Sequence, residues 1–278
     1  MTSVGIVTGA GRGMGFECAQ KLVDLVDHLL LIDLNESTVT AAAETLAARG
    51  RASTEAFVLD ICDLEGLARL ADRVGELGDL RAVAHAAGIS PTMADWRRIF
   101  EVDLIGTARL AAALRPLARK DTATVCFSSM SVALRPPKPI DAAVDALMVD
   151  PLGEDFLDRI REISGEDIES TSEAYPVAKR GVRVFVQQEA VRLGSVGARI
   201  CSVSPGVTDT PQGRQEAAAH PSMQRLIDAT PLARMGRPEE VADVAVYTLT
   251  DDASFLNGVD LLVDGGVVAA LATRSRRS

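Results

Sequence analysis

The sequence predicts an α/β fold in which helices cover both faces of a doubly wound parallel sheet. Short apolar runs alternate with stretches of helical spacing along the chain of 278 residues, and this alternation is typical of such sheets. The first apolar run, residues 4–7, passes directly into a glycine-rich turn and then into a helix-compatible stretch, residues 16–26. This order predicts an anion-binding site, because the unpaired N–H groups and the dipole at a helix start favour negative charge.

The glycine-rich turn contains Gly9, Gly11, Gly13 and Gly15. Its spacing does not fit the dinucleotide fingerprint G-x-G-x-x-G, because residue 14 is methionine; the turn reads T-G-x-x-x-G-x-G from Thr8. Glycines here would let a pyrophosphate approach the backbone and let the helix pack close to the strand. The alternative interpretation is a tight turn before a core helix.

The remaining elements follow in regular alternation, without a repeat or a linker, so we expect a single domain. Strands are predicted at residues 28–33, 53–59, 81–85, 123–127, 199–204 and 259–263, and helices at residues 37–48, 64–77, 95–118 and 239–249. Ser37 is expected to cap the helix that it opens. Parallel strands joined by helices take right-handed crossovers, which place the helices on both faces of the sheet.

Charge and hydropathy exclude several classes of protein. A net charge of −10 without a basic stripe argues against a nucleic-acid partner. Arg274, Arg276 and Arg277 are interpreted as part of a solvated C-terminal tail, residues 267–278. No apolar run is long enough to span a membrane, and a first strand that starts near residue 3 leaves no room for a signal peptide.

Cysteine and histidine usage indicates a reducing compartment and no metal. The four cysteines are scattered without a C-x-x-C motif, so we expect reduced, structural thiols in a cytoplasmic protein. They are Cys18, Cys62, Cys126 and Cys201. The three histidines, His28, His85 and His220, have no partner at a metal-ligand spacing, so we expect no metal site.

Asp33 ends the second predicted strand, 18 residues after Gly15. In this architecture an acid at that place accepts hydrogen bonds from the adenosine ribose and repels a 2′-phosphate, which favours NAD over NADP. Arg12 in the glycine turn opposes this prediction, because a cation there could pair with a 2′-phosphate. A solvated acid at a strand end is the alternative for Asp33.

Three polar residues are candidates for proton chemistry. Ser129 follows the fifth predicted strand, and Tyr175 and Lys179 lie four residues apart in Y-P-V-A-K, a spacing that puts both side chains on one helix face. An ammonium beside the phenol is expected to lower the tyrosine pKa, so that the pair can exchange a proton with an alcohol. Pro176 requires Tyr175 to lie near the helix start. The spacing alone is common by chance.

At this point the sequence resembles the short-chain dehydrogenase/reductase family over almost its whole length. The resemblance rests on TGAGRGMG at 8–15, Asp33, Asp60, SSM at 128–130, YPVAK at 175–179, SPGVTDT at 204–210, RMGRPEEVA at 234–242 and LLVDGG at 261–266. It implies a single-domain Rossmann fold with a seven-stranded sheet, and hydride transfer to or from a nicotinamide.

The resemblance also implies functions for individual residues. Ser129, Tyr175 and Lys179 match the catalytic residues of the family, Asp60 matches the residue that contacts adenine, and Thr210 matches the threonine that holds the nicotinamide carboxamide. The cofactor-binding positions implied in this way are Gly9, Arg12, Gly13, Met14, Gly15, Asp33, Asp60, Ile61, Ala87, Gly88, Tyr175, Lys179, Pro205, Gly206, Val207, Thr208 and Thr210.

Two positions depart from the family pattern. His85-Ala86-Ala87-Gly88 replaces Asn-Asn-Ala-Gly, and we interpret His85 as structural. Asp103 replaces the asparagine that helps to hold a relay water beside the lysine. Its backbone carbonyl could still hold that water, whereas a carboxylate next to Lys179 would weaken the relay argument.

A third departure is an insertion before the catalytic tyrosine. Tyr175 follows Ser129 by 46 residues, and the extra segment, residues 134–170, contains candidate helices at 141–148 and 156–163. The apolar side chains of the second helix are expected to face the substrate cleft as a lid, or else another subunit. The insertion resembles that of the bacterial 3α-hydroxysteroid dehydrogenase/carbonyl reductase branch.

These observations predict an NAD-dependent alcohol dehydrogenase or ketone reductase that acts on a bulky apolar substrate, for which a hydroxysteroid is one candidate. Its partners are expected to be a small-molecule alcohol or ketone substrate and further copies of the chain, as a dimer or tetramer. The alternatives are an acyl-thioester ketoreductase that uses NADPH and a non-catalytic dinucleotide sensor. Asp33 and the net negative charge argue against the ketoreductase. The presence of Ser129, Tyr175 and Lys179 argues against the non-catalytic sensor.

Overall fold

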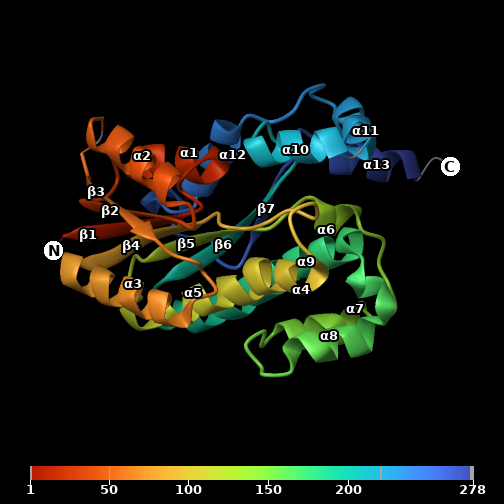
Figure 1. Ribbon diagram of the computed structural model, residues 1–278, viewed down its shortest axis with the longest axis horizontal. Coiled ribbons are helices and arrows are strands. Elements are labelled where there is room, and N and C mark those ends of the chain that lie inside the picture. The colour runs from red at the N-terminus through yellow and green to blue at the C-terminus, as the bar shows by residue number, and fades with distance from the viewer. Residues whose placement is uncertain (1, 50, 220, 276–278) are drawn as a thin grey trace.

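The computed structural model describes residues 2–49, 51–219 and 221–275 (Figure 1). Seven parallel strands form one sheet in the order β3-β2-β1-β4-β5-β6-β7, which confirms the predicted fold class. The strands are β1 (Ser3–Thr8), β2 (His28–Asp33), β3 (Ser53–Val58), β4 (Asp79–His85), β5 (Ala123–Phe127), β6 (Arg199–Pro205) and β7 (Asp260–Val263). The order reverses between β1 and β4, and ligands of such sheets bind at the carboxyl ends beside this reversal.

Helices cover both faces of the sheet (Figure 1). One layer consists of α1 (Gly13–Leu22), α2 (Glu36–Ala47) and α12 (Pro238–Tyr247), and the other contains α3 (Leu64–Leu77), α5 (Gly106–Leu114) and α9 (Thr171–Gly194). Neighbouring residues of β2 therefore enter different cores: Leu29 and Leu31 face the first layer, and Leu30 the second. Burial on both sides explains why the strands read as continuous apolar runs.

The predicted helix over residues 95–118 consists of four segments. It contains α4 (Trp96–Phe100), a π-helical segment η1 (Glu101–Ile105), α5 and a 3₁₀ turn, η2 (Arg115–Leu117). The predicted cap of α2 was wrong by two residues, because Asn35 precedes the helix and accepts a hydrogen bond from the N–H of Thr38 at 3.1 Å. Among the described residues, no helix combines the length and apolarity needed to cross a bilayer.

Three helices near the C-terminus were not predicted. They are α10 (Pro211–Ala219), α11 (Pro221–Ala229) and α13 (Val267–Ser275). The prediction of a solvated tail over residues 267–278 was wrong up to residue 275, because α13 packs against α11 and buries Val267 completely. Arg274 is exposed on α13, whereas Arg276 and Arg277 lie outside the described residues.

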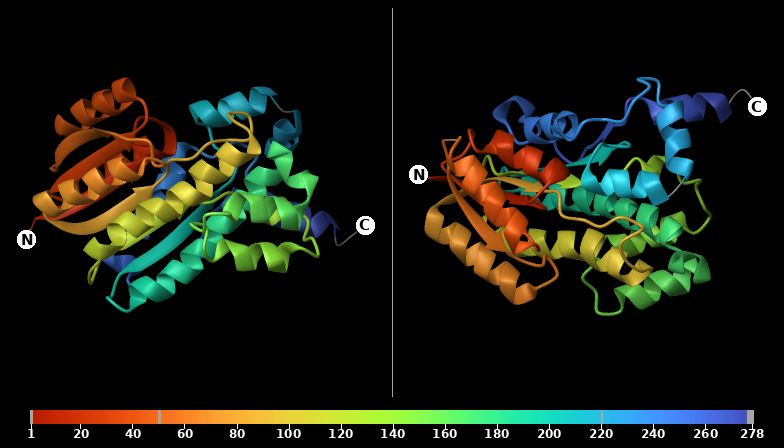
Figure 2. Two further views of the ribbon diagram at one scale, coloured as in Figure 1. Left: turned by 60° about the horizontal axis from the view of Figure 1, so that its bottom comes forward. Right: turned by 45° about the horizontal axis from the view of Figure 1, so that its top comes forward.

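The insertion begins at the end of α6 (Ser131–Leu134) and folds into α7 (Asp141–Met148), α8 (Phe156–Ser164) and the 3₁₀ turn η3 (Glu166–Glu169). Figures 1 and 2 place α8 below α4 and α9, on the opposite side of the molecule from α10 and α11. Phe156 and Ile160 are fully buried in the same core cluster as Phe100 of α4, and the rings of Phe156 and Phe100 pack edge to face at 6.1 Å.

The prediction that the apolar face of α8 covers the substrate cleft or contacts another subunit was therefore wrong for its buried side chains. Its apolar face packs on helices of its own chain, which leaves those buried side chains available neither to a substrate nor to a second subunit.

Candidate active site

The turn between β1 and α1 forms a cradle of backbone atoms. Gly13 has φ +59°, a conformation that favours glycine, and a Cβ on Gly15 would overlap the carbonyl oxygen of Gly9. No side chain caps the start of α1, and its first turn contains no acidic residue. The turn therefore offers unpaired N–H groups and the positive end of a helix dipole to an anion.

This cradle opens into a cavity of about 510 Å³ at the carboxyl ends of the strands. The predicted cofactor residues that line it are Gly9, Arg12, Gly13, Met14, Gly15, Asp33, Asp60, Ile61, Ala87, Gly88 and Thr210. Six predicted residues do not line it: Tyr175, Lys179, Pro205, Gly206, Val207 and Thr208. The lining residues that the sequence reasoning missed include Asn35, Met93, Arg98 and Gln212, which carry no motif of their own.

Two carboxylates are fixed in the wall of this cavity. Asp33 accepts hydrogen bonds from the N–H groups of Gly11 at 3.0 Å and Asn35 at 3.1 Å. Asp60 accepts one from Arg98 at 2.9 Å. Burial opposes ionisation of Asp60, but bonds from the backbone of Cys62 and from Arg98 outweigh it and lower the pKa of Asp60. Both side chains are therefore held against the cavity before any ligand binds.

Ser129, Tyr175 and Lys179 meet where β5 ends beside α9. Lys179 donates from Nζ to the carbonyl oxygen of Phe127 at 3.1 Å, and the Ser128 hydroxyl donates to the carbonyl oxygen of Lys179 at 2.9 Å. These two bonds tie the strand end to the helix. The ammonium lies 5.8 Å from the centre of the Tyr175 ring, so the two side chains lie near each other, as their spacing predicts.

The position of Tyr175 near the start of α9 follows from Pro176. The helix begins at Thr171, so the hydrogen bond that proline cannot donate falls on the carbonyl of the exposed Ser172. Water can satisfy that carbonyl, which is why the proline is tolerated there.

The comparisons with known proteins agree with this geometry. The family model described as enoyl-(acyl carrier protein) reductase matches residues 9–140 and 160–268. The chain belongs to the short-chain dehydrogenase/reductase family. Enzymes of this family use nicotinamide cofactors, and the cradle, the fixed carboxylates and the adjoining cavity fit such a group.

Individual relatives match over nearly the whole chain. A cis-4-hydroxycyclohexanecarboxylate dehydrogenase of Sinomonas cyclohexanicum is 30% identical, with 96% of both chains covered. The 3-alpha-hydroxysteroid dehydrogenase/carbonyl reductase of Comamonas testosteroni is 26% identical and covers 97% of this chain and 98% of its own. A solved short-chain type dehydrogenase/reductase from Mycobacterium ulcerans has a TM-score of 0.76 at 23% identity, with 96% and 90% covered. Its likeness supports the fold.

The pKa of Tyr175 is raised, whereas the sequence predicted a lowered pKa. Burial raises it well above its ordinary value, and the carboxylates of Asp103 and Glu216 raise it further, whereas a hydrogen bond with Ser129 lowers it. The expectation that Lys179 lowers this pKa was therefore wrong for the chain without its cofactor. Burial is the largest cause of the raised pKa, and Asp103, whose carboxylate sits 3.4 Å from the Lys179 ammonium, adds to it as a like charge.

His85, the other departure from the family pattern, is buried and bridges β1 to α5. Its Nε2 lies 2.9 Å from the Thr107 hydroxyl, and its Nδ1 lies 2.7 Å from the Thr8 hydroxyl. Thr107 donates its own proton to the carbonyl oxygen of Asp103 at 2.7 Å, so His85 must donate from Nε2 and accept at Nδ1. Burial lowers the pKa of His85 to about 3. Within the described ranges, no three metal-ligand side chains cluster as a metal site needs; His220 lies outside them.

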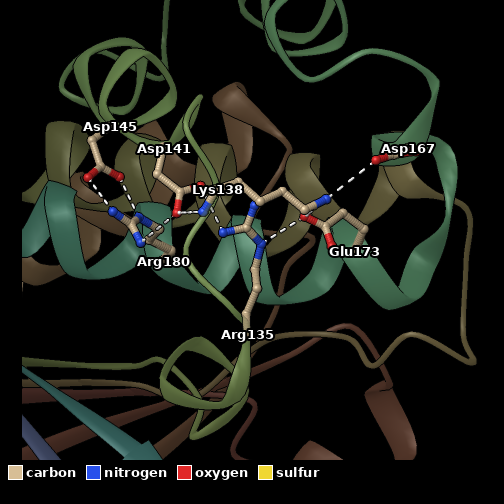
Figure 3. Close-up of polar contacts among 7 residues, drawn as sticks. All are labelled: Arg135, Lys138, Asp141, Asp145, Asp167, Glu173 and Arg180. Carbon is tan, nitrogen blue, oxygen red and sulfur yellow. Dashed lines mark hydrogen bonds and ion pairs between the residues drawn. The ribbon is translucent and has the colours of Figure 1, made fainter.

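Hydrogen bonds and ion pairs among seven charged residues link the insertion to α9 (Figure 3). They are Arg135, Lys138, Asp141, Asp145, Asp167, Glu173 and Arg180. The family match is interrupted at residues 141–159, which include α7 and the start of α8. Sequence reasoning missed this network, because Arg135 and its partner Glu173 lie 38 residues apart in the chain.

Proposed function

We propose that the protein is an NAD(H)-dependent oxidoreductase that transfers a hydride between nicotinamide and a secondary alcohol or ketone. The observation that carries this proposal is the meeting of Ser129, Tyr175 and Lys179 beside the cavity of about 510 Å³. Gly88 lies next to both Lys179 and the cavity. It lines the cavity, and a Cβ on it would lie 3.1 Å from Lys179 Nζ. When bound, the nicotinamide supplies or accepts the hydride.

The residues of the chain supply the proton chemistry and the positioning. The Tyr175 hydroxyl donates a proton to the developing alkoxide of a ketone, or accepts one from an alcohol. Ser129 orients the substrate oxygen, and Lys179 holds the nicotinamide ribose and influences the protonation of Tyr175. The backbone of the glycine turn binds the pyrophosphate.

NAD is favoured over NADP by Asp33. Its carboxylate is fixed by two backbone N–H groups in the cavity wall, where a 2′-phosphate would meet like charge. Arg12 lines the same cavity, and no hydrogen bond or ion pair joins its side chain to another described residue. Arg12 is the observation that favours the second candidate, an acyl-thioester ketoreductase that uses NADPH.

For the substrate we propose a bulky, apolar cyclic secondary alcohol, with a hydroxysteroid as one candidate. The support comes from relatives that are named for a hydroxycyclohexanecarboxylate and for a hydroxysteroid. The lid argument no longer supports bulk, because the apolar face of α8 is buried against α4. Nicotinamide absorbance during turnover of a panel of cyclic and linear alcohols and ketones tests this proposal, with NAD(H) and NADP(H) compared in parallel. Faster turnover with NADP(H), or of linear thioesters, would favour the second candidate.

We also propose that the chain forms a homo-oligomer through the open edge of the sheet. β7 lies at that edge, and Phe255, Val259 and Leu262 expose apolar side chains on or just before it. Unpaired strand edges with apolar side chains invite pairing. Light scattering of a Phe255→Ser/Leu262→Ser double variant should show smaller species than the parent; an unchanged mass would exclude this edge.

Cytoplasmic location remains part of the same proposal. All four cysteines are free, and Cys18, Cys126 and Cys201 are buried. Free buried thiols are usual in reducing compartments. Fractionation of the source cells tests this, and recovery outside the cytoplasm would contradict it.

A further inference from the structure

Asp103 places a buried carboxylate next to the proton-transfer residues. It lies in the π-helical segment η1 and is 1% exposed. Its Oδ1 accepts the N–H of Ile89 at 2.9 Å and lies 3.4 Å from Lys179 Nζ, whereas its buried Oδ2 has no hydrogen-bond partner. Gly88 packs directly against Asp103 and Lys179, because a Cβ on Gly88 would lie 2.8 Å from Asp103 Oδ1.

The negative charge of Asp103 is not needed to hold the fold together. Its backbone carbonyl accepts the Thr107 hydroxyl, and only one side-chain oxygen is used, by Ile89. An amide of the same shape would keep both bonds and would avoid the desolvation of a carboxylate. Burial raises the pKa of Asp103, whereas the attraction of Lys179 and the bond from Ile89 lower it. An ionised carboxylate at this place therefore costs stability, and Lys179 and Ile89 offset part of that cost.

The carboxylate of Asp103 disfavours the Tyr175 phenolate directly, as a like charge, and it also lies beside the ammonium that would favour this phenolate. An ammonium near a phenol favours the phenolate, and a carboxylate 3.4 Å from that ammonium cancels most of its potential.

The other titratable groups around this point do not restore the positive potential. His85 on β4 is neutral, because burial lowers its pKa to about 3, and Cys126 on β5 keeps its proton, because burial raises its pKa to about 12. Glu216 on α10 adds a further negative charge near Tyr175.

We propose that Asp103 is a positioning residue whose charge neutralises Lys179 and thereby holds Tyr175 in its protonated form at neutral pH. A protonated Tyr175 can donate to a carbonyl oxygen but cannot accept a proton from an alcohol. The site is therefore set for carbonyl reduction at neutral pH, and alcohol oxidation is displaced to alkaline pH. The consequence for turnover rests on the proposed function, whereas the charge coupling itself does not.

The coupling can be measured without cofactor or substrate, because the chain has only two tyrosines. Tyr247→Phe removes the other one, which is 47% exposed, and leaves the phenolate absorbance to Tyr175 alone. In this background, Asp103→Asn is expected to lower the pH at which Tyr175 ionises by on the order of one unit. Glu101→Gln is the matched control, because it removes an acid from the same segment, where it pairs with Arg98 at 3.4 Å, and should leave Tyr175 unchanged.

The outcomes separate this inference from the proposed function. An unchanged or higher ionisation pH in Asp103→Asn overturns the inference, and so does an equal shift in Glu101→Gln. Asp103→Ser removes the charge by a second route and must shift Tyr175 in the same direction; loss of folding in both variants would show a structural role and would also overturn the inference.

Turnover gives a separate readout. If Tyr175 shifts and turnover is present, the acidic limb of kcat/KM for alcohol oxidation moves to lower pH in Asp103→Asn. If Tyr175 shifts but no alcohol or ketone is turned over, the proposed function fails and the charge coupling stands.

Discussion

The guanidinium of Arg135 donates from Nε to a carboxylate oxygen of Glu173 at 2.7 Å, which joins the end of α6 to the first turn of α9. Glu173 precedes Tyr175 by two residues. The Arg135 side chain is only 6% exposed and also donates to Asp141 at 2.8 Å. The inserted segment is thus anchored in the same helical turn that carries the proposed proton donor.

Replacement of Arg135 by alanine should destabilise the fold by about 3 kcal/mol, because it leaves the nearly buried carboxylates of Asp141 and Glu173 without their shared partner. Urea unfolding measures this change. Arg161→Ala is the control in the same insertion, since its pair with Glu169 is about half exposed and should contribute less than about 1 kcal/mol. Equal losses in the two variants would contradict the anchoring.

The buried position of α8 predicts a defect in stability rather than in substrate binding. Phe156→Ala should cost about 3–5 kcal/mol, because its ring packs on Phe100 in the core, and it should leave KM for large alcohols within the error of measurement. Leu152→Ala, at a side chain that is 42% exposed, should change the free energy of unfolding by less than about 0.5 kcal/mol. If Phe156→Ala instead raised KM for large alcohols and kept normal stability, α8 would act as a lid on the substrate.

His85 predicts a specific loss of stability in acid. Its pKa is about 3 in the folded chain and about 6.5 in the unfolded chain, so the unfolded state binds the extra proton as the pH falls. The stability that neutral His85 contributes is complete above about pH 6.5 and is lost toward about pH 3. His85→Asn cannot titrate and should lose less stability over this window in urea unfolding. His28→Asn is the control. An equal loss of unfolding free energy in acid by the parent protein, His85→Asn and His28→Asn would contradict a buried neutral imidazole at His85.

Asp33→Ala should narrow the proposed preference for NADH over NADPH, because it removes the carboxylate that we propose lies against the 2′-oxygen. Calorimetric titration with both dinucleotides measures the ratio of their dissociation constants. Asp27→Ala is the control, since Asp27 precedes β2 at its other end and binds Ser3. Tighter binding of NADPH than of NADH by the unmodified protein would mean that Arg12 dominates.

The sheet was predictable because its strands are buried on both faces and therefore read as apolar runs. The helices α10 and α11 were not predictable. α10 is polar along most of its length, and α11 acquires its core from distant segments that include Met130, Val207 and α13. The candidate site residues were predicted from their motifs. A carboxylate of Asp103 beside Lys179 was one of the alternatives, but its separation of 3.4 Å from the ammonium could not be read from the sequence, because the fold brings together segments 76 residues apart.

The central claim is that Tyr175 transfers the proton. Turnover of a cyclic secondary alcohol by Tyr175→Phe, followed by nicotinamide absorbance, tests it most directly. The loss should be about 10²–10⁴-fold, with dinucleotide affinity kept, because the hydroxyl contributes little to cofactor binding; Tyr247→Phe, at an exposed tyrosine of α12, should retain full turnover. Near-normal turnover in Tyr175→Phe would contradict the account.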